Sequence, residues 1–190
     1  WDEANAILEI LKKNKHVQQI SIAGSLRRRK EIVKDIDFVV ASSNPEAVMK
    51  TFTTLPGLQH IIAHGGTKSS VVLSKGIQLD LRCVNEKEFP YALHHFTGSK
   101  EHNVALRGRA QAMGMKMNEY GLFKGEKLIP CKNEEEIYKH LGLAYIPPEM
   151  RENQGEIEAA TQNKIPKLVT AKDIKGIFHN HTTYSDGKAS

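Results

Sequence analysis

The residues best suited to chemistry lie in one short stretch, from Gly24 to Asp37. Gly24 lacks a Cβ and lets a phosphate approach the backbone closely, and Ser25 adds a hydroxyl donor. The arginines at 27–29 carry guanidinium groups that suit phosphate oxygens. Asp35 and Asp37 then open an apolar run, and side chains two apart on a strand point to the same side. The two carboxylates should converge, and a hard divalent cation such as magnesium would relieve their repulsion.

Each part of this stretch also has an ordinary structural interpretation. An Asp-x-Asp pair at the start of a strand is common in solvent-facing turns, and Gly-Ser before arginines is common in loops. The conjunction favours function, because phosphate donors, cations and a carboxylate pair lie within one strand-loop-strand unit. Together they predict metal-dependent transfer of a nucleotidyl group.

The elements that position these residues follow from the spacing of apolar side chains and from capping residues. Asn44 followed by Pro45 is a typical helix start, Ser99 and Asn133 can cap two further helices, and Gly142 can end the last. The predicted helices cover residues 2–13, 45–55, 91–96, 100–113 and 134–141. The predicted strands cover residues 17–23, 36–41, 58–63, 70–73, 77–84, 118–123 and 127–129.

The strand predicted over 77–84 carries a third carboxylate. Its apolar residues alternate with Gln78, Asp80 and Arg82, so Asp80 stands on the face opposite the core. An exposed aspartate paired with Arg82 is the alternative interpretation. Aspartate is a poor strand former, so its position in mid-strand favours a functional reason.

Composition sets broad limits on the class of protein. The chain has 190 residues, 39% of them hydrophobic, which suits one ordinary domain or two small ones. Its net charge of +5 suits a polyanionic partner, although many basic proteins have no such partner. Cys83 and Cys131 lack a metal-type spacing, which favours a reducing compartment. No apolar run approaches a membrane span and no signal peptide is evident, so we expect a cytoplasmic chain with no membrane partner.

Two groups of motifs resemble one known family. The pattern Gly-Ser-x-Arg-Arg-x-x-Glu-x-x-x-Asp-x-Asp, over residues 24–37, resembles the palm of nucleotidyltransferases and of the bacterial family X DNA polymerases in particular. Leu79-Asp80-Leu81-Arg82 is similar to the strand that carries this family's third carboxylate. The sequences Phe-Thr-Gly-Ser-Lys-Glu-His-Asn, over 96–103, and Asn-Glu-Tyr-Gly-Leu-Phe, over 118–123, resemble its thumb.

The resemblance implies a fold and a function. The expected fold is α+β, with a mixed-sheet palm over 1–89, a helical thumb with a small hairpin over 90–145 and a linker over 146–173. The expected activity is that of a DNA-directed DNA polymerase, which adds deoxynucleotides from dNTP to a primer on a primer-template or gapped DNA in repair. We expect a monomer, and a truncated piece of a longer protein that has a DNA-gripping domain upstream.

The resemblance also implies a role for each matching residue. Asp35, Asp37 and Asp80 would be catalytic and hold two magnesium ions, or manganese in their place. Arg27 and Glu31 are expected to form a local structural ion pair, and His95 departs from the tyrosine of eukaryotic members at the sugar contact. The expected nucleotide-binding residues are Gly24, Ser25, Arg28, Phe96, Gly98 and Asn103, and the expected DNA contacts are Arg82, Lys100 and Arg107.

Residues 174–190 contain a second candidate metal motif. His179 and His181 would lie on one side of an extended chain, as a metal pair requires, although an exposed pair without function is the simpler alternative. With Asp186 they resemble the first motif of a polymerase-and-histidinol-phosphatase (PHP) domain. By that resemblance zinc or manganese would bind there in the full-length protein, because the remaining ligands lie beyond Ser190.

Two other classes of function stay open at this point. A metal-dependent phosphoesterase or exonuclease would rest on the C-terminal histidine motif, and we expect that domain to be incomplete here. A non-catalytic DNA-binding fragment would rest on the basic charge alone.

Overall fold

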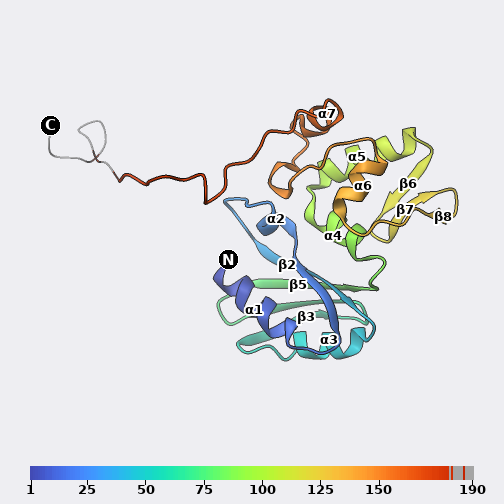
Figure 1. Cartoon of the computed structure of the whole chain (residues 1–190). Coiled ribbons are helices and arrows are strands. Elements are labelled where there is room, and N and C mark those ends of the chain that lie inside the picture. The colour runs from blue at the N-terminus through green and yellow to red at the C-terminus, as the bar shows by residue number, and fades with distance from the viewer. Residues whose placement is uncertain (180, 182–185, 187–190) are drawn as a thin grey trace.

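The N-terminal half of the chain folds around a five-stranded mixed sheet in the computed structural model, which describes residues 1–179, 181 and 186 (Figure 1). Strands β2 and β5 run parallel, and the other neighbouring pairs run antiparallel. In spatial order the strands are β1 (Val17–Ile22), β2 (Asp35–Ser42), β5 (Gln78–Val84), β4 (Lys68–Leu73) and β3 (Leu58–His64).

Helices α1 (Asp2–Lys12) and α3 (Pro45–Phe52) cover one face of this sheet. The alternation in β2 sends Ile36, Phe38 and Val40 into the core beneath them. The predicted start of α3 is confirmed, because the Asn44 side chain accepts a hydrogen bond from the backbone N–H of Ala47 at 3.2 Å.

Helix α4 (Phe89–Thr97) lies against part of the opposite face. It packs on Val39 and Ala41, in the C-terminal half of β2, through Ala92 and Leu93. The first residues of β2 lie beyond this apolar cluster. This partial cover leaves the beginning of β2 available for polar side chains.

The C-terminal half forms a second core around Leu106, Leu122 and Ile137, which are fully buried. The predicted caps of its helices are confirmed, because Ser99 accepts from the N–H of His102 and Asn133 accepts from that of Glu136, both at 3.0 Å. The elements are α5 (Lys100–Ala112), β6 (Met115–Asn118), β7 (Gly121–Lys124), β8 (Lys127–Leu128) and α6 (Glu134–His140).

Two local expectations were wrong. The stretch that follows β1 is not all loop, because Gly24–Arg27 forms one turn of helix, α2. The single strand expected over 118–123 is the end of β6, a turn and the start of β7. Asn118 makes this turn, since its side-chain oxygen accepts from the N–H groups of Tyr120 and Gly121 at 3.0 and 3.1 Å.

Part of the segment expected to be a linker lies in the second core. A short 3₁₀ helix, η1 (Pro148–Met150), is followed by α7 (Glu156–Thr161). Ile146, Ile157 and Ala160 all belong to the buried cluster of this half. We call residues 146–156 the strap, because they run back from the second half toward the loop that begins at Gly24.

The α+β fold class expected from the sequence is confirmed. Cys83 and Cys131 are buried as free thiols. Among the described residues, no helix combines the length and the apolar composition that crossing a membrane demands.

Candidate active site

Three carboxylates lie at the start of the two central strands. In the register of β2 and β5, Asp37 lies opposite Asp80, and Asp35 lies opposite Gln78. Their neighbours Ile36, Phe38, Leu79 and Leu81 are buried on the other face, in the core. Asp80 therefore stands on the face opposite the core, as expected, and Asp35 and Asp37, which were expected to share a side, lie on that same face.

The ionisation of Asp37 reflects this crowding. Burial and the negative charges of Asp35 and Asp80 raise the pKa of Asp37 to about 7, although the cations Arg28 and Lys68 oppose the shift. A carboxyl group with such a pKa is a common sign of a functional site. The charges of Asp35 and Asp80 both disfavour the ionised form of Asp37.

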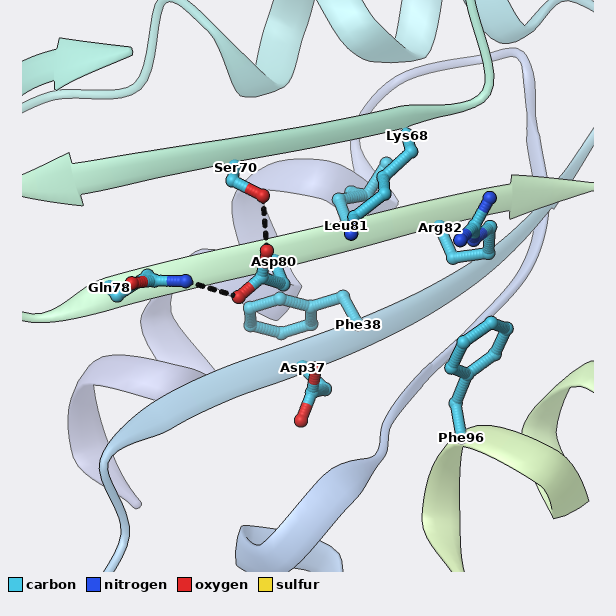
Figure 2. A pocket seen from close by; sticks show the side chains of 9 residues that line it. All are labelled: Asp37, Phe38, Lys68, Ser70, Gln78, Asp80, Leu81, Arg82 and Phe96. Atoms are coloured by element: carbon cyan, nitrogen blue, oxygen red, sulfur yellow. Dashed lines mark hydrogen bonds between the residues drawn. The ribbon is translucent and has the colours of Figure 1, made fainter. Parts of the chain in front are cut away.

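Asp80 is held by two neighbours on its own face of the sheet (Figure 2). Ser70 on β4 donates a short hydrogen bond to one carboxylate oxygen, and the Gln78 amide donates to the other at 2.8 Å. The Asp80 carboxylate therefore turns toward Ser70 and Gln78, while that of Asp37 points elsewhere. In the described part of the chain, no three His, Cys, Asp or Glu side chains are already arranged to hold a metal ion.

A cavity of about 310 Å³ opens over these residues. Asp37 and Asp80 lie in its wall together with Lys68, Arg82 and Phe96 (Figure 2). The Arg82 guanidinium lies 5.1 Å from the centre of the Phe96 ring, as in a cation–π contact. The cavity thus combines acidic and basic walls with one aromatic edge, a suitable lining for a charged, ring-containing ligand.

Gly24 makes a close approach to Asp37. Its φ of +61° lies in the left-handed region, and a Cβ added there would collide with the Asp37 carboxylate. Ser25 follows in α2 and is half-buried. Gly24 and Ser25, the two residues expected to contact phosphates, therefore lie beside Asp37.

Arg28 and Arg27 leave α2 in different directions and have different partners. Arg28 forms an ion pair with Glu152 of the strap, with 2.8 Å between Nε and Oε1, and it donates to the backbone carbonyl of Thr97 at 2.7 Å. Arg27 bonds Glu134 on α6 through both terminal nitrogens, and also the Thr97 hydroxyl at 2.6 Å.

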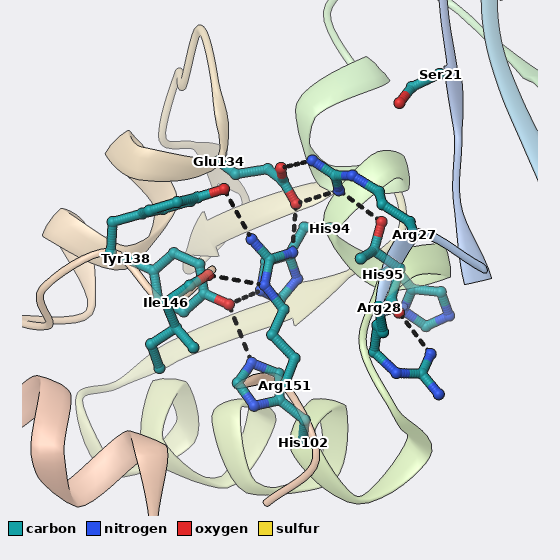
Figure 3. A network of polar contacts seen from close by, with 12 residues as sticks. Ser21, Arg27, Arg28, His94, His95, His102, Glu134, Tyr138, Ile146 and Arg151 are labelled. Atoms are coloured by element: carbon teal, nitrogen blue, oxygen red, sulfur yellow. Dashed lines mark hydrogen bonds and ion pairs between the residues drawn. The ribbon is translucent and has the colours of Figure 1, made fainter. Parts of the chain in front are cut away.

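The expected ion pair between Arg27 and Glu31 is wrong. Glu31 is exposed, and the partner of Arg27 lies 107 residues away in the sequence. Glu134 also binds Arg151, which is fully buried, so one carboxylate joins two arginines from distant segments (Figure 3). This pairing ties α2 of the first half to α6 and the strap of the second.

The residues expected at the nucleotide sugar and base lie together where α4 ends and α5 begins. A Cβ on Gly98 would come within 2.7 Å of the Asn103 side-chain oxygen. The Asn103 amide donates to the carbonyl of His95 at 2.7 Å, and the rings of His95 and Phe96 meet edge to face. Burial lowers the pKa of His95, so its imidazole is neutral at pH 7.

The expected DNA contacts divide into two environments. Lys100 and Arg107 are exposed on α5. Arg82 lies in the cavity wall, and its buried Nε has no hydrogen-bond partner among the described residues. Burying a hydrogen-bond donor without a partner costs free energy. Arg82 is therefore a candidate to donate to a ligand in the cavity.

His179, His181 and Asp186 of the C-terminal motif belong to the described part of the chain, and the rest of the motif lies outside the described residues. His181 contacts His179 through the two Nε2 atoms, and its Nδ1 bonds the Asp186 carboxylate. All three residues are exposed. The structure thus places them together but gives them no packed surroundings in the described part of the chain.

Several residues of the site escaped the sequence analysis. Lys68 and Ser70 lie in the wall of the cavity and Glu152 pairs with Arg28, yet no motif distinguishes them. Lys68 and Ser70 are two residues apart on β4. The alternation of side chains could therefore have placed both on the face of the sheet that carries Asp80. Glu152 could not have been found in this way, since 124 residues separate it from Arg28.

Comparisons with known proteins show which family of sequences this chain resembles. A family model described as the DNA polymerase beta thumb matches residues 92–152. A DNA polymerase/3′-5′ exonuclease PolX from Bacillus subtilis is 42% identical over 191 residues, which cover 98% of this chain and 33% of that protein. A repair DNA polymerase X from African swine fever virus is 31% identical over 153 residues, which cover 76% of this chain and 85% of the viral protein. The human DNA-directed DNA/RNA polymerase mu is 37% identical over 92 residues, which cover 47% of this chain and 19% of that protein.

The extent of these matches differs between relatives. The chain spans about a third of the length of the Bacillus protein and most of the length of the viral one. The similarity therefore includes both halves of the chain and is not confined to the segment that the family model covers.

Proposed function

This chain belongs to the family X DNA polymerases, and from that premise we propose that it adds deoxynucleotides to a primer 3′ end, directed by a template, in gap-filling repair. The observation that carries the proposal is the register of β2 and β5, which sets Asp37 opposite Asp80 with Asp35 on the same face. Nucleotidyl transfer needs such a carboxylate cluster beside a site for phosphates.

Divalent cations fit this donor set. Carboxylate oxygens are the ligands that magnesium prefers, and a cation would oppose the burial and the repulsion that raise the pKa of Asp37. Asp35, Asp37 and Asp80 are the residues that would hold two magnesium ions, or manganese. Such ions would activate the primer hydroxyl and neutralise charge on the triphosphate.

The phosphates of the incoming dNTP would lie beside α2. Gly24 carries no side chain, which lets the backbone that would face them pass close to Asp37. The Ser25 hydroxyl and the Arg28 guanidinium are the donors in this role. Arg82, whose buried Nε lacks a partner among the described residues, would supply a further cation inside the cavity.

The nucleoside would lie along the end of α4 and the start of α5. Phe96 and Gly98 offer an aromatic edge and a flat backbone to the sugar, and Asn103 offers a polar edge to the base. The neutral His95 takes the place of a tyrosine at this contact. Lys100 and Arg107, exposed on α5, would contact the DNA backbone and the template strand.

A direct experiment is incorporation of one dNTP into a one-nucleotide gap with magnesium. We expect insertion of the complementary nucleotide, faster on gapped than on blunt DNA and abolished by EDTA. Insertion without regard to the template base would contradict template direction, and no insertion on any DNA would contradict the proposal as a whole. Size-exclusion chromatography with light scattering would test the proposed monomer.

A further inference from the structure

Arg28 is fixed at two points of its guanidinium group. Its Nε pairs with Glu152 Oε1 at 2.8 Å, and its Nη1 donates to the Thr97 carbonyl at 2.7 Å. Both side chains of the ion pair are largely buried, with 13% of Arg28 and 20% of Glu152 exposed. Two such contacts determine the plane of a rigid guanidinium group.

The strap that carries Glu152 is itself firmly anchored. The neighbouring Arg151 is fully buried, donates from Nε to the Ile146 carbonyl at 3.0 Å, and forms an ion pair with Glu134. Its own carbonyl accepts from the N–H of Ser99 at 3.1 Å. Glu152 therefore extends from a backbone that is attached to the second core.

The other end of the strap is held as well. Glu156 binds buried His102 at 2.6 Å and accepts from the N–H groups of Asn153 and Gln154 (the His102 surroundings appear in Figure 3). The position of Glu152 is thus set from both sides. Because Glu152 has a fixed position, its ion pair can fix the position of the Arg28 guanidinium group.

Arg28 keeps donors that these contacts do not use. Its Nη2 makes no hydrogen bond to any residue in the described part of the chain. A cavity of about 440 Å³ lies beside Arg28 and Glu152, with Arg29 and Lys30 in its wall. The Lys30 ammonium lies 3.5 Å from Glu152 and offsets part of its negative charge.

We propose that Glu152 is a positioning residue for nucleotide binding: it holds the Arg28 guanidinium so that Nη2 serves a phosphate oxygen of the dNTP. The inference rests on the proposed polymerase function. An arginine that is already oriented loses less freedom when it binds a phosphate, so the contact to Glu152 lowers the KM for the nucleotide. The chemical step does not need Glu152, so kcat does not depend on it.

The chain supplies a matched control. Glu149 lies on the same strap and pairs with the next arginine, Arg29, at 3.2 Å, but that arginine is 65% exposed. Solvent-exposed ion pairs contribute little. Replacement of Glu149 changes the charge of the strap by the same amount without touching Arg28.

The experiment measures KM for the dNTP and kcat on gapped DNA with magnesium. Glu152→Ala is expected to raise KM about fivefold with kcat changed by less than about twofold. Glu152→Gln, whose amide oxygen still accepts from Nε, stays near wild type. Glu149→Ala also leaves both constants unchanged. In an Arg28→Lys background, Glu152→Ala has no further effect, because the guanidinium that it positions is gone.

Three outcomes would overturn the inference. A lower KM in both Glu152→Ala and Glu152→Gln would make Glu152 a competitor of the triphosphate rather than a support for Arg28. A KM for Glu152→Ala equal to that of Glu149→Ala would leave Glu152 no role in nucleotide binding. A full fivefold effect in the Arg28→Lys background would show that it does not act through Arg28.

Two further measurements separate folding and function from positioning. If Glu152→Ala melts well below the wild type, Glu152→Lys is used instead, and its repulsion of Arg28 is expected to raise KM by more than the alanine does. An unchanged KM in that variant overturns the inference. A wild-type chain that incorporates no nucleotide overturns the proposed function itself, whereas an active wild type with a neutral Glu152→Ala overturns the positioning role alone.

Discussion

Asp37 and Asp80 lie opposite each other on two neighbouring parallel strands, yet their carboxylates have different surroundings. That of Asp80 accepts hydrogen bonds from Ser70 and Gln78, whereas that of Asp37 packs against Gly24. Burial and repulsion raise the pKa of Asp37 to about 7. The metal-free protein therefore carries an electrostatic cost at Asp37 that a cation would remove.

Asp37→Asn is expected to stabilise the metal-free protein. The pKa of Asp37 is raised in the folded state above its ordinary value of 3.8, so stability is lost as the pH rises from about 4 to 7 and stays lower above that. Asparagine carries no charge over this pH range, so the variant does not lose this stability. In EDTA, the variant should gain about 2 kcal/mol in the free energy of unfolding at pH 8 and almost nothing at pH 4.

Urea unfolding at several pH values provides the measurement. A constant difference between variant and wild type across this range would contradict the raised pKa. Magnesium should reduce the difference in unfolding free energy between variant and wild type at pH 8, because an ion that binds the folded wild type stabilises it.

Gly24→Ala is expected to reduce stability and activity by more than the strain of a left-handed alanine alone would. The new Cβ would collide with the Asp37 carboxylate, in addition to the strain of φ +61°. We expect a loss of about 2 kcal/mol or more in stability and at least about a tenfold loss of incorporation.

Gly125→Ala is the matched control for this collision. Gly125 has nearly the same φ, +60°, and nothing lies within 4 Å of the Cβ position. Thermal unfolding of both variants separates strain from collision. Equal destabilisation of the two would refute the close approach of Gly24 to Asp37.

Glu134→Gln is expected to destabilise the chain by about 3 kcal/mol, because it leaves two arginines without their charged partner. Burial alone would raise the pKa of Glu134, but the hydrogen bonds and charges of Arg27 and Arg151 hold it below its usual value. Glu135→Gln, at the exposed neighbouring position, should cost almost nothing. Similar unfolding free energies for the two variants would show that the network contributes little.

Local rules explain what the sequence could predict. The period of two in β5 was enough to place Asp80 opposite the core, and the capping residues Asn44, Ser99 and Asn133 marked three helix starts. The same rules gave the carboxylates a common face, since β2 and β5 both alternate there. Each of these inferences depends on residues within a few positions of one another.

The remaining features depend on contacts that join distant segments. The acidic partners of Arg27 and Arg28 lie in α6 and the strap, more than 100 residues away, and no local pattern links them. Strand β6 was missed because Met115-Lys116-Met117 contains no β-branched residue. Residues 146–173 were predicted to be a linker, and no local pattern shows that Arg151 and Glu156 within it are buried, each with a partner that makes its burial possible.

The C-terminal motif is expected to give this chain no exonuclease activity. Its three exposed side chains can fill only part of a metal ion's coordination sphere, and a hydrolytic site needs its ions held in fixed geometry. A variant that combines His179→Ala and His181→Ala should match the wild type in nucleotide release from single-stranded DNA with manganese. Release by the wild type that disappears in the variant would show a working site.

Incorporation of one dNTP into gapped DNA by Asp37→Ala protein tests the role of the carboxylate cluster most directly. DNA affinity is measured in parallel by fluorescence anisotropy, and Asp173→Ala, on the exposed tail, is the control. We expect Asp37→Ala to lose at least about a thousandfold in rate while DNA affinity changes by less than about twofold. A variant that keeps about a tenth of the wild-type rate would contradict a catalytic role for Asp37.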